Sequence, residues 1–143
     1  MSKLLLLSLI GLIVISGCIA PDEGATKIVD SFYSSVETKN YDAIFDLIGR
    51  ERLTPELENK TLNLLNTVNI KLGTLQSYNL TKWKTTSYAT VVGEDQSGDY
   101  IYLVYDVVYE NYSAVEEFTI FKPRGTNQYS ITNYHVSSDG FFV

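Results

Sequence analysis

The chain has 143 residues, a formal net charge of −6 and a single cysteine. This length suits one domain that buries a core without cross-links, and a lone cysteine excludes a disulfide within the chain. An acidic chain without a basic cluster argues against binding of nucleic acid and against electrostatic docking on anionic lipid. Eleven tyrosines against one tryptophan are typical of half-buried sheet faces or of binding surfaces, and composition does not separate the two.

The N-terminus has the order of a signal peptide. Lys3 is followed by a mostly apolar run over residues 4–15 and then by Ser16-Gly17-Cys18. The run is shorter than the roughly 20 residues of a membrane-spanning helix, and small residues stand where a signal peptidase must fit. The segment Ile15-Ser16-Gly17-Cys18 resembles the bacterial and archaeal lipobox, although Leu is commoner where Ile15 stands.

The lipobox resemblance implies cleavage after Gly17 and lipidation of the Cys18 sulfur, with fatty acids such as palmitate. The mature chain then begins at Cys18 and carries a net charge of −7, because Lys3 is the only charged residue removed. Two or three chains, at roughly 0.8 kcal/mol per buried CH₂, hold a small domain durably. We therefore expect a lipoprotein at the outer face of the cytoplasmic membrane, or at an outer membrane. The alternative is an uncleaved signal anchor beside an unmodified cysteine.

The predicted organisation has three parts. Residues 1–17 form the signal peptide, residues 18–25 the lipidated cysteine with a short tether, and residues 26–143 a single α+β domain. The sequence contains no internal repeat and no low-complexity segment.

Three helices are predicted at the start of the domain. Apolar residues recur at helical spacing from Ile28 to Val36 and again from Tyr41 to Ile48, with Gly49 as a stop. Thr54-Pro55 starts the third helix as N-cap and first helical residue, and Gly73 closes it.

After Gly73 the apolar period changes from helical to two. Strands are predicted over residues 75–84, 88–92, 100–109, 115–121 and 128–136. Links this short between strands indicate that neighbouring strands are antiparallel. The apolar C-terminus, residues 139–143, is expected to pack on the domain or to pair with a strand. The fold class is α+β, with N-terminal helices packed on a curved antiparallel sheet of four to five strands.

This arrangement resembles the cystatin-like and nuclear transport factor 2-like superfamily, in particular its small exported members of unknown function. The resemblance rests on the segment from Phe32 to Leu47, on the segment from Leu72 to Ser77 where the third helix ends, and on the antiparallel strands that follow. It implies a cone-shaped sheet and, as is common for this fold, a homodimer through the sheet face. It implies little about chemistry, because the superfamily contains enzymes, binding modules and assembly domains.

The chain offers few groups for catalysis or metal binding. Nucleophile motifs and glycine-rich phosphate loops are missing from the sequence, and a single histidine leaves carboxylates as the metal ligands. The pairs Asp22-Glu23, Glu94-Asp95 and Glu116-Glu117 are adjacent, and neighbours on a strand point to opposite faces. We therefore expect no metal and no cofactor.

Two residues are weak candidates for acid–base catalysis. Asp106 lies mid-strand in phase with several tyrosines, and His135 shares the phase of Ile131 and Asn133. In a dry pocket with tyrosine nearby, either side chain could act as a base. The simpler interpretation places both on the solvated face of the sheet.

Two hypotheses about function follow. The first is a non-catalytic module that binds a protein or a small ligand at the membrane. The alternative is a small-molecule enzyme of the isomerase or dehydratase type that uses Asp106 or His135, and it requires one of them to line a closed apolar pocket. Asn59, Asn79 and Asn111 match the N-glycosylation pattern, which matters only in some hosts.

The anchor predicts a defined mature N-terminus. Mass spectrometry of protein extracted from membranes should give a chain that begins at Cys18 and carries the mass of added lipid. An intact Met1 together with an unmodified Cys18 would contradict the lipoprotein prediction.

Overall fold

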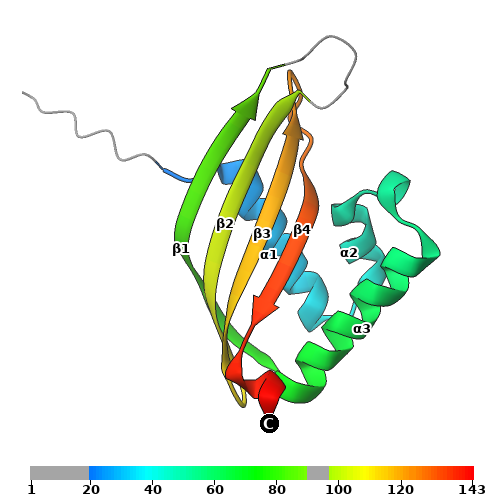
Figure 1. Ribbon diagram of the computed structural model, residues 1–143, viewed down its shortest axis with the longest axis vertical. Coiled ribbons are helices and arrows are strands. Elements are labelled where there is room, and N and C mark those ends of the chain that lie inside the picture. The colour runs from blue at the N-terminus through cyan, green and yellow to red at the C-terminus, as the bar shows by residue number, and fades with distance from the viewer. Residues whose placement is uncertain (1–19, 90–96) are drawn as a thin grey trace, which may run out of the picture.

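The computed structural model of the protein describes residues 20–89 and 97–143 (Figure 1). The predicted signal peptide, Cys18 and the Glu94-Asp95 turn lie outside these residues. The elements follow in the order α1 (Glu23–Glu37), α2 (Tyr41–Ile48), η1 (Arg50–Arg52), α3 (Pro55–Leu72), β1 (Leu75–Tyr88), β2 (Gly98–Tyr109), β3 (Ser113–Pro123), β4 (Ser130–Ser137) and η2 (Asp139–Phe142).

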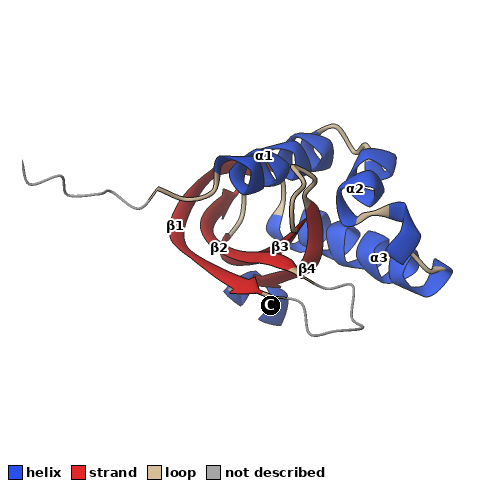
Figure 2. Ribbon diagram, turned by 90° about the horizontal axis from the view of Figure 1, so that it is seen from above, coloured by secondary structure: helices blue, strands red, loops and turns tan. Residues whose placement is uncertain are grey.

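The strands form one antiparallel sheet in the order β1-β2-β3-β4. The sheet is curved and unclosed, and α1 lies across its concave side, while α2 and α3 stand beyond β4 (Figure 2). This confirms the predicted α+β class with N-terminal helices on a curved sheet. The edges of the sheet are β1 and β4.

Each α-helix begins at a side chain that caps it. Asp22, Asn40 and Thr54 each accept a hydrogen bond from the backbone N–H three residues further on, at 2.9, 3.2 and 3.2 Å. These bonds satisfy amides that have no partner inside the helix. The start of α3 at Thr54-Pro55 and its end before Gly73 agree with the sequence-based prediction.

Helix α1 begins earlier than predicted. The segment of residues 18–25 was expected to be a tether, but the Asp22 carboxylate caps a helix whose first residue is Glu23. Gly24 lies in its first turn against the ring of Tyr129, and a Cβ there would come within 2.2 Å of that ring. The glycine therefore serves close packing. In the described chain, only residues 20–22 remain as tether.

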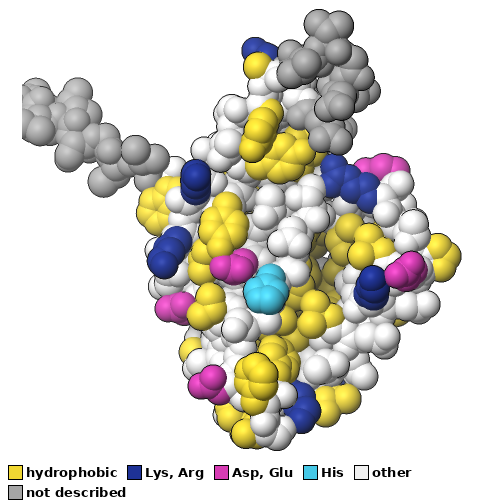
Figure 3. Space-filling model, viewed as in Figure 1, with side chains coloured by type: hydrophobic (Ala, Val, Ile, Leu, Met, Phe, Trp, Pro, Cys, Tyr) yellow, Lys and Arg dark blue, Asp and Glu magenta, His cyan; other side chains and the backbone are white. Residues whose placement is uncertain are grey.

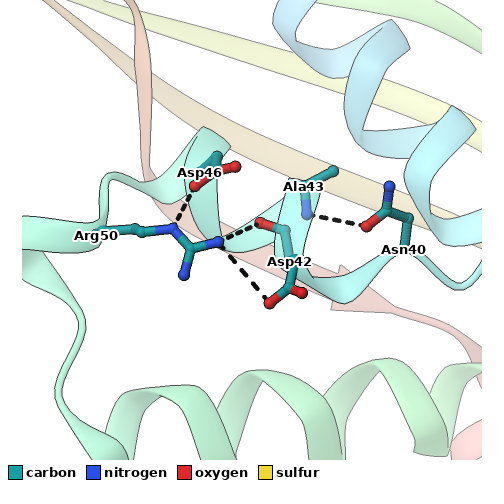
Figure 4. Close-up of polar contacts among 5 residues, drawn as sticks. All are labelled: Asn40, Asp42, Ala43, Asp46 and Arg50. Carbon is teal, nitrogen blue, oxygen red and sulfur yellow. Dashed lines mark hydrogen bonds and ion pairs between the residues drawn. The ribbon is translucent and has the colours of Figure 1, made fainter.

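Arg50 holds the turn that follows α2 (Figure 4). Its guanidinium pairs with the Asp46 carboxylate one helical turn earlier, and its second arm lies 3.4 Å from the Asp42 carbonyl oxygen and 3.8 Å from the Asp42 carboxylate. These groups are exposed, so solvent screens each pair and the pairs contribute little to stability. Their common effect is to fix the exit of the chain at Gly49, which has a φ of 92°.

The core lies between the concave face of the sheet and α1. Alternate residues of β2 point inward from Ile101 to Tyr109, and α1 contributes residues at helical spacing from Ala25 to Tyr33. Aromatic rings dominate the centre: Phe32, Tyr33, Tyr78, Tyr105, Phe118 and Tyr134. Most of these pairs meet edge to face or tilted, as the ring quadrupole favours.

The first strand is longer than predicted. The sequence indicated separate strands at 75–84 and 88–92, whereas β1 continues to Tyr88 and pairs with β2 from end to end, apart from register shifts between Leu75 and Ser77 and between Leu80 and Lys82. The polar stretch Thr85–Ser87 stays extended because its backbone hydrogen-bonds to β2, a tertiary effect that the local pattern does not contain. The sheet therefore has four strands, and residues 90–92 lie outside the described chain.

The C-terminus packs only in part: Gly140 is buried, whereas Phe142 and Val143 are 89 % and 72 % exposed, so the expected packing does not extend to the last two apolar residues. Gly140 of η2 lies so close to Leu72 and Tyr112 that a Cβ would meet both side chains at 2.6 Å. Ser138 caps the turn and donates to the Ser113 carbonyl oxygen at 2.6 Å. The end of the chain is thereby fastened to the last turn of α3.

Gly73 provides a test of the α3–β1 connection. Its φ of 87° and ψ of −157° lie in a region essentially restricted to glycine, at a cost of about 1–3 kcal/mol for other residues. A Cβ would also lie 2.9 Å from the Glu110 Cβ. We expect Gly73→Ala to lower the free energy of unfolding in urea by about 2 kcal/mol or more.

Gly125→Ala is the matched control. Gly125 also has a positive φ, 74°, but a Cβ there meets nothing within 4 Å. It should cost only the backbone strain of about 1–2 kcal/mol. Equal losses for the two variants would show that the close contact at Gly73 has no effect.

Candidate functional site

A fully buried carboxyl group lies at the centre of the protein. Glu116 of β3 points inward and has no exposed surface. The Tyr33 hydroxyl of α1 donates to one carboxyl oxygen at 2.9 Å, and the Tyr109 hydroxyl of β2 donates to the other at 2.5 Å. The Tyr134 hydroxyl of β4 also stabilises the charged form of this carboxyl group and lowers its pKa. Side chains from four different elements therefore meet at one acid.

Two opposing effects set the protonation of Glu116. Burial raises its pKa because the low dielectric penalises the charged form, while the hydroxyls of Tyr109, Tyr33 and Tyr134 lower it by stabilising the carboxylate. Burial is the larger effect, so the pKa lies above its ordinary value. Burial, followed by the Glu116 charge, also raises the pKa values of the three tyrosines. Their hydroxyls therefore remain protonated donors.

The Glu116 cluster, defined as Glu116 with Tyr33, Tyr109 and Tyr134, orders the core. Every buried polar side-chain atom in the described chain has a hydrogen-bond partner, so the cluster avoids the penalty of an unpaired buried group. Because Glu116 has no exposed surface, a bound molecule could touch the carboxyl group only after a tyrosine moved. The arrangement suits positioning of side chains rather than proton transfer to a substrate.

An apolar cleft opens beside this cluster, between β4 and the helices. It has a volume of about 220 Å³, and hydrophobic side chains line the recess between the sheet and the helices in Figure 3. Four elements contribute the lining residues: Phe32, Ile48, Leu57, Lys60, Thr61, Leu64, Ile131, Thr132, Asn133 and Tyr134. The apolar residues form most of the wall, and Lys60, Thr61, Thr132 and Asn133 supply polar groups.

Tyr134 connects the cleft with the buried acid. Its ring lines the cleft, and the ring centroid lies 5.0 Å from those of both Phe32 and Phe118. Its hydroxyl is one of the groups that lower the pKa of Glu116. The rotamer of Tyr134 is therefore held from both ends. A group bound in the cleft would meet a preformed aromatic wall rather than a mobile side chain.

Asp106 and His135 lie away from this cleft. Both are exposed on the outer face of the sheet, where the single histidine is visible in Figure 3. Asp106 borders an open depression of about 540 Å³ whose other lining residues include no tyrosine. Among residues 20–89 and 97–143, the apolar cleft has neither Asp106 nor His135 in its lining. The condition that the enzyme hypothesis set for these residues is not met.

The predicted phase of β4 was wrong on one side of a bulge. His135 was placed in phase with Ile131, yet Ile131 is buried opposite Ile120 and His135 is exposed opposite Glu117. An extra residue, Thr132, interrupts the pairing, so inward and outward positions exchange beyond it. The period of two holds only within each half of the strand.

Glu116 was present in the sequence as one of an adjacent acidic pair. The prediction that the pair points to opposite faces is confirmed, because Glu117 lies outside and accepts from Tyr102 at 2.5 Å. The signal for a buried acid was its alternation with Ala114, Phe118 and Ile120 on one face. No sequence pattern identified the tyrosines that hold it.

Other expected features can be located in the structure. Asn59, Asn79 and Asn111 are all exposed. Over residues 20–89 and 97–143 no group of His, Asp or Glu is arranged to hold a metal ion. Within the same ranges no helix combines the length and the apolar character needed to cross a membrane.

Comparison with known proteins gives no relative: no family model, no curated protein and no solved structure matches the chain. The cystatin-like and nuclear transport factor 2-like resemblance therefore stays a prediction from the sequence.

The raised pKa of Glu116 predicts a pH-dependent stability. Between the unfolded pKa of about 4.3 and the raised native value, the native state binds more protons than the unfolded state, so stability falls as pH rises. Glu116→Gln removes this titration. We expect the wild type to lose stability relative to Glu116→Gln as pH increases through that window, measured by urea unfolding at several pH values.

Glu117→Gln is the control, since it changes the neighbouring, half-buried acid on the outer face of the same strand. Its unfolding curves give the effect of an acid-to-amide change outside the core at each pH, and this baseline is subtracted from the Glu116→Gln result. A difference between the wild type and Glu116→Gln that does not vary with pH would contradict a raised native pKa.

Proposed function

We propose that the protein is a lipid-anchored, extracytoplasmic binding module whose ligand places an apolar group in the cleft beside β4. The observation that carries the binding role is the cleft itself, with apolar walls, polar groups among its lining residues and an aromatic side held by the Glu116 cluster. The anchor is supported by the signal peptide pattern and the lipobox ending at Cys18.

The shape of the cleft favours binding over chemistry. Ligand sites are typically concave, mostly apolar and lined by a few placed polar groups. Among its lining residues, Lys60 is paired with Glu56 at 3.1 Å on the exposed side of α3, and Thr132 donates to the Thr119 carbonyl oxygen. The described residues thus supply orientation and apolar contact, while the one buried acid is enclosed behind Tyr134.

The volume limits what enters. The cleft volume of about 220 Å³ is less than the 300–1,000 Å³ typical of sites for drug-sized ligands. One ring or one branched aliphatic group fits. The ligand is therefore a compact molecule, or a larger molecule that inserts a single apolar group.

The isomerase or dehydratase alternative has no comparable observation. It needs a base in a closed pocket, and both Asp106 and His135 are exposed. We therefore retain the binding module and the envelope location, at the outer face of the cytoplasmic membrane or at an outer membrane.

Indole is a suitable probe of the cleft, because it is a compact aromatic molecule. In two-dimensional NMR of the chain from Cys18 onward, we expect indole to shift the amide signals of residues 131–134 and 60–64, with roughly millimolar affinity. Leu64→Trp, which places a large side chain in the cleft, should abolish these shifts.

Ile70→Trp provides the matched control. Ile70 lies on the same helix, is 67 % exposed and does not line the cleft, so its replacement should leave the indole shifts unchanged. Shifts that survive Leu64→Trp, or that fall mainly outside the cleft in the wild type, would refute this binding site.

A further inference from the structure

The lipid anchor of the proposed function must lie close to the described start of the domain. Cys18 and Ala20 are two residues apart, and a fully extended chain spans at most about 3.6 Å per residue. Their Cα atoms are therefore within about 7 Å of each other in any conformation. Because α1 begins at Glu23, the linker between the anchor and the domain is shorter than predicted and allows less movement. The membrane surface must pass near Ala20.

The part of the domain nearest to this point is the free edge of the sheet. In both Figure 1 and Figure 2 the chain leading into α1 runs past β1 on the side away from β2. Among the described residues, strand β1 pairs with β2 alone, so its other edge carries backbone groups that this sheet does not use. A membrane near Ala20 therefore faces this edge.

The side chains of this edge suit a lipid surface. Trp83 is 42 % exposed although its position, opposite Leu103, belongs to the inward-facing set. Lys82 and Lys84 flank it, are exposed and are the only cationic residues of β1. They point to the opposite face from Trp83, so the three side chains lie on both sides of the edge. Tryptophan favours the headgroup level of a bilayer, and lysines near the surface attract anionic headgroups.

We propose that the β1 edge, through Trp83, Lys82 and Lys84, rests on the phospholipid headgroup layer beside the anchor and fixes the orientation of the domain. The proposal rests on the lipidation of Cys18 in the proposed function. The contact lies at headgroup depth, because the free backbone groups of β1 need polar partners that hydrocarbon does not offer.

The anchor is essential to this contact. A mature net charge of −7 disfavours approach to anionic lipid, so two lysines would not recruit the free domain. Once the anchor holds Ala20 at the surface, the lysines act only on orientation. A different role for lysines on an edge strand is to block pairing with other strands, and that role does not require Trp83 to touch lipid.

Trp83 is the only tryptophan of the chain, so its fluorescence reports this contact directly. The chain from Cys18 onward contains every described residue, and its single thiol can be coupled to a maleimide lipid in phosphatidylcholine–phosphatidylglycerol vesicles. We expect vesicles made with brominated phospholipid to quench Trp83 emission. Equal emission in brominated and ordinary vesicles would overturn the proposal.

Four variants sharpen this test. Trp83→Phe combined with Phe142→Trp moves the fluorophore to a residue that is 89 % exposed near the C-terminus, which lies at the far end of the sheet in Figure 1, and quenching should be lost. A long Gly-Ser insertion between Ala20 and Pro21 should reduce quenching of Trp83. Lys82→Gln and Lys84→Gln should each lower the ratio of docked to undocked domain roughly fivefold on anionic vesicles.

Failure of the two proposals can be told apart. Coupling through maleimide places the domain on lipid whether or not a cell modifies Cys18. An unmodified Cys18 in membrane extracts therefore counts against the natural anchor, while absent quenching counts against the β1 contact. Equal quenching of a tryptophan at position 142 would show that the domain has no preferred orientation, and would also overturn the proposal.

Discussion

The hydrogen bonds between the Glu116 carboxyl group and its tyrosines tie the helices to the sheet. Tyr33 comes from α1 and Tyr109 from the end of β2, so a shift of either element against β3 breaks a hydrogen bond in the interior. Apolar contacts alone tolerate small displacements, whereas a buried acid without partners costs several kcal/mol. The polar centre therefore selects one position of α1 on the concave face.

The cleft depends on this same constraint. Tyr134 forms part of its wall and Phe32, one residue before Tyr33, forms another part. With Tyr33 hydrogen-bonded to Glu116 and the Tyr134 ring packed against Phe32 and Phe118, the rings that a ligand meets are in place before it arrives. Binding then costs less side-chain entropy than it would at a loose surface. The enclosed acid thus contributes to recognition without touching the ligand.

Local signals in the sequence were sufficient for the helices and for the overall class. Thr54-Pro55 and Gly73 delimit α3 because capping chemistry acts within a few residues. The early start of α1 was missed because Pro21 and Gly24 suggested a tether, although Asp22 was a good cap. The continuity of β1 was missed as well, since its polar end is held by pairing with β2.

The candidate site was harder to predict, because its parts are distant in the chain. Alternation along β3 placed Glu116 on the inner face, but Tyr33 is 83 positions away, and no period connects the two. Asp106 was expected on the solvated side under the simpler interpretation, and it lies there. His135 also lies there. A bulge at Thr132 puts it on the opposite face from Ile131, with which the sequence had placed it in phase. The sequence pattern does not reveal a single extra residue of this kind.

The short link between Cys18 and α1 determines how the proposed module would meet its partners. A domain on a long linker samples a hemisphere of solution, but one held within a few ångströms of the bilayer moves only in two dimensions. Its encounters then scale with the number of molecules per area of membrane. Partners in the same leaflet meet it often even when they are scarce in the cell, and a soluble partner must come to the surface to be found.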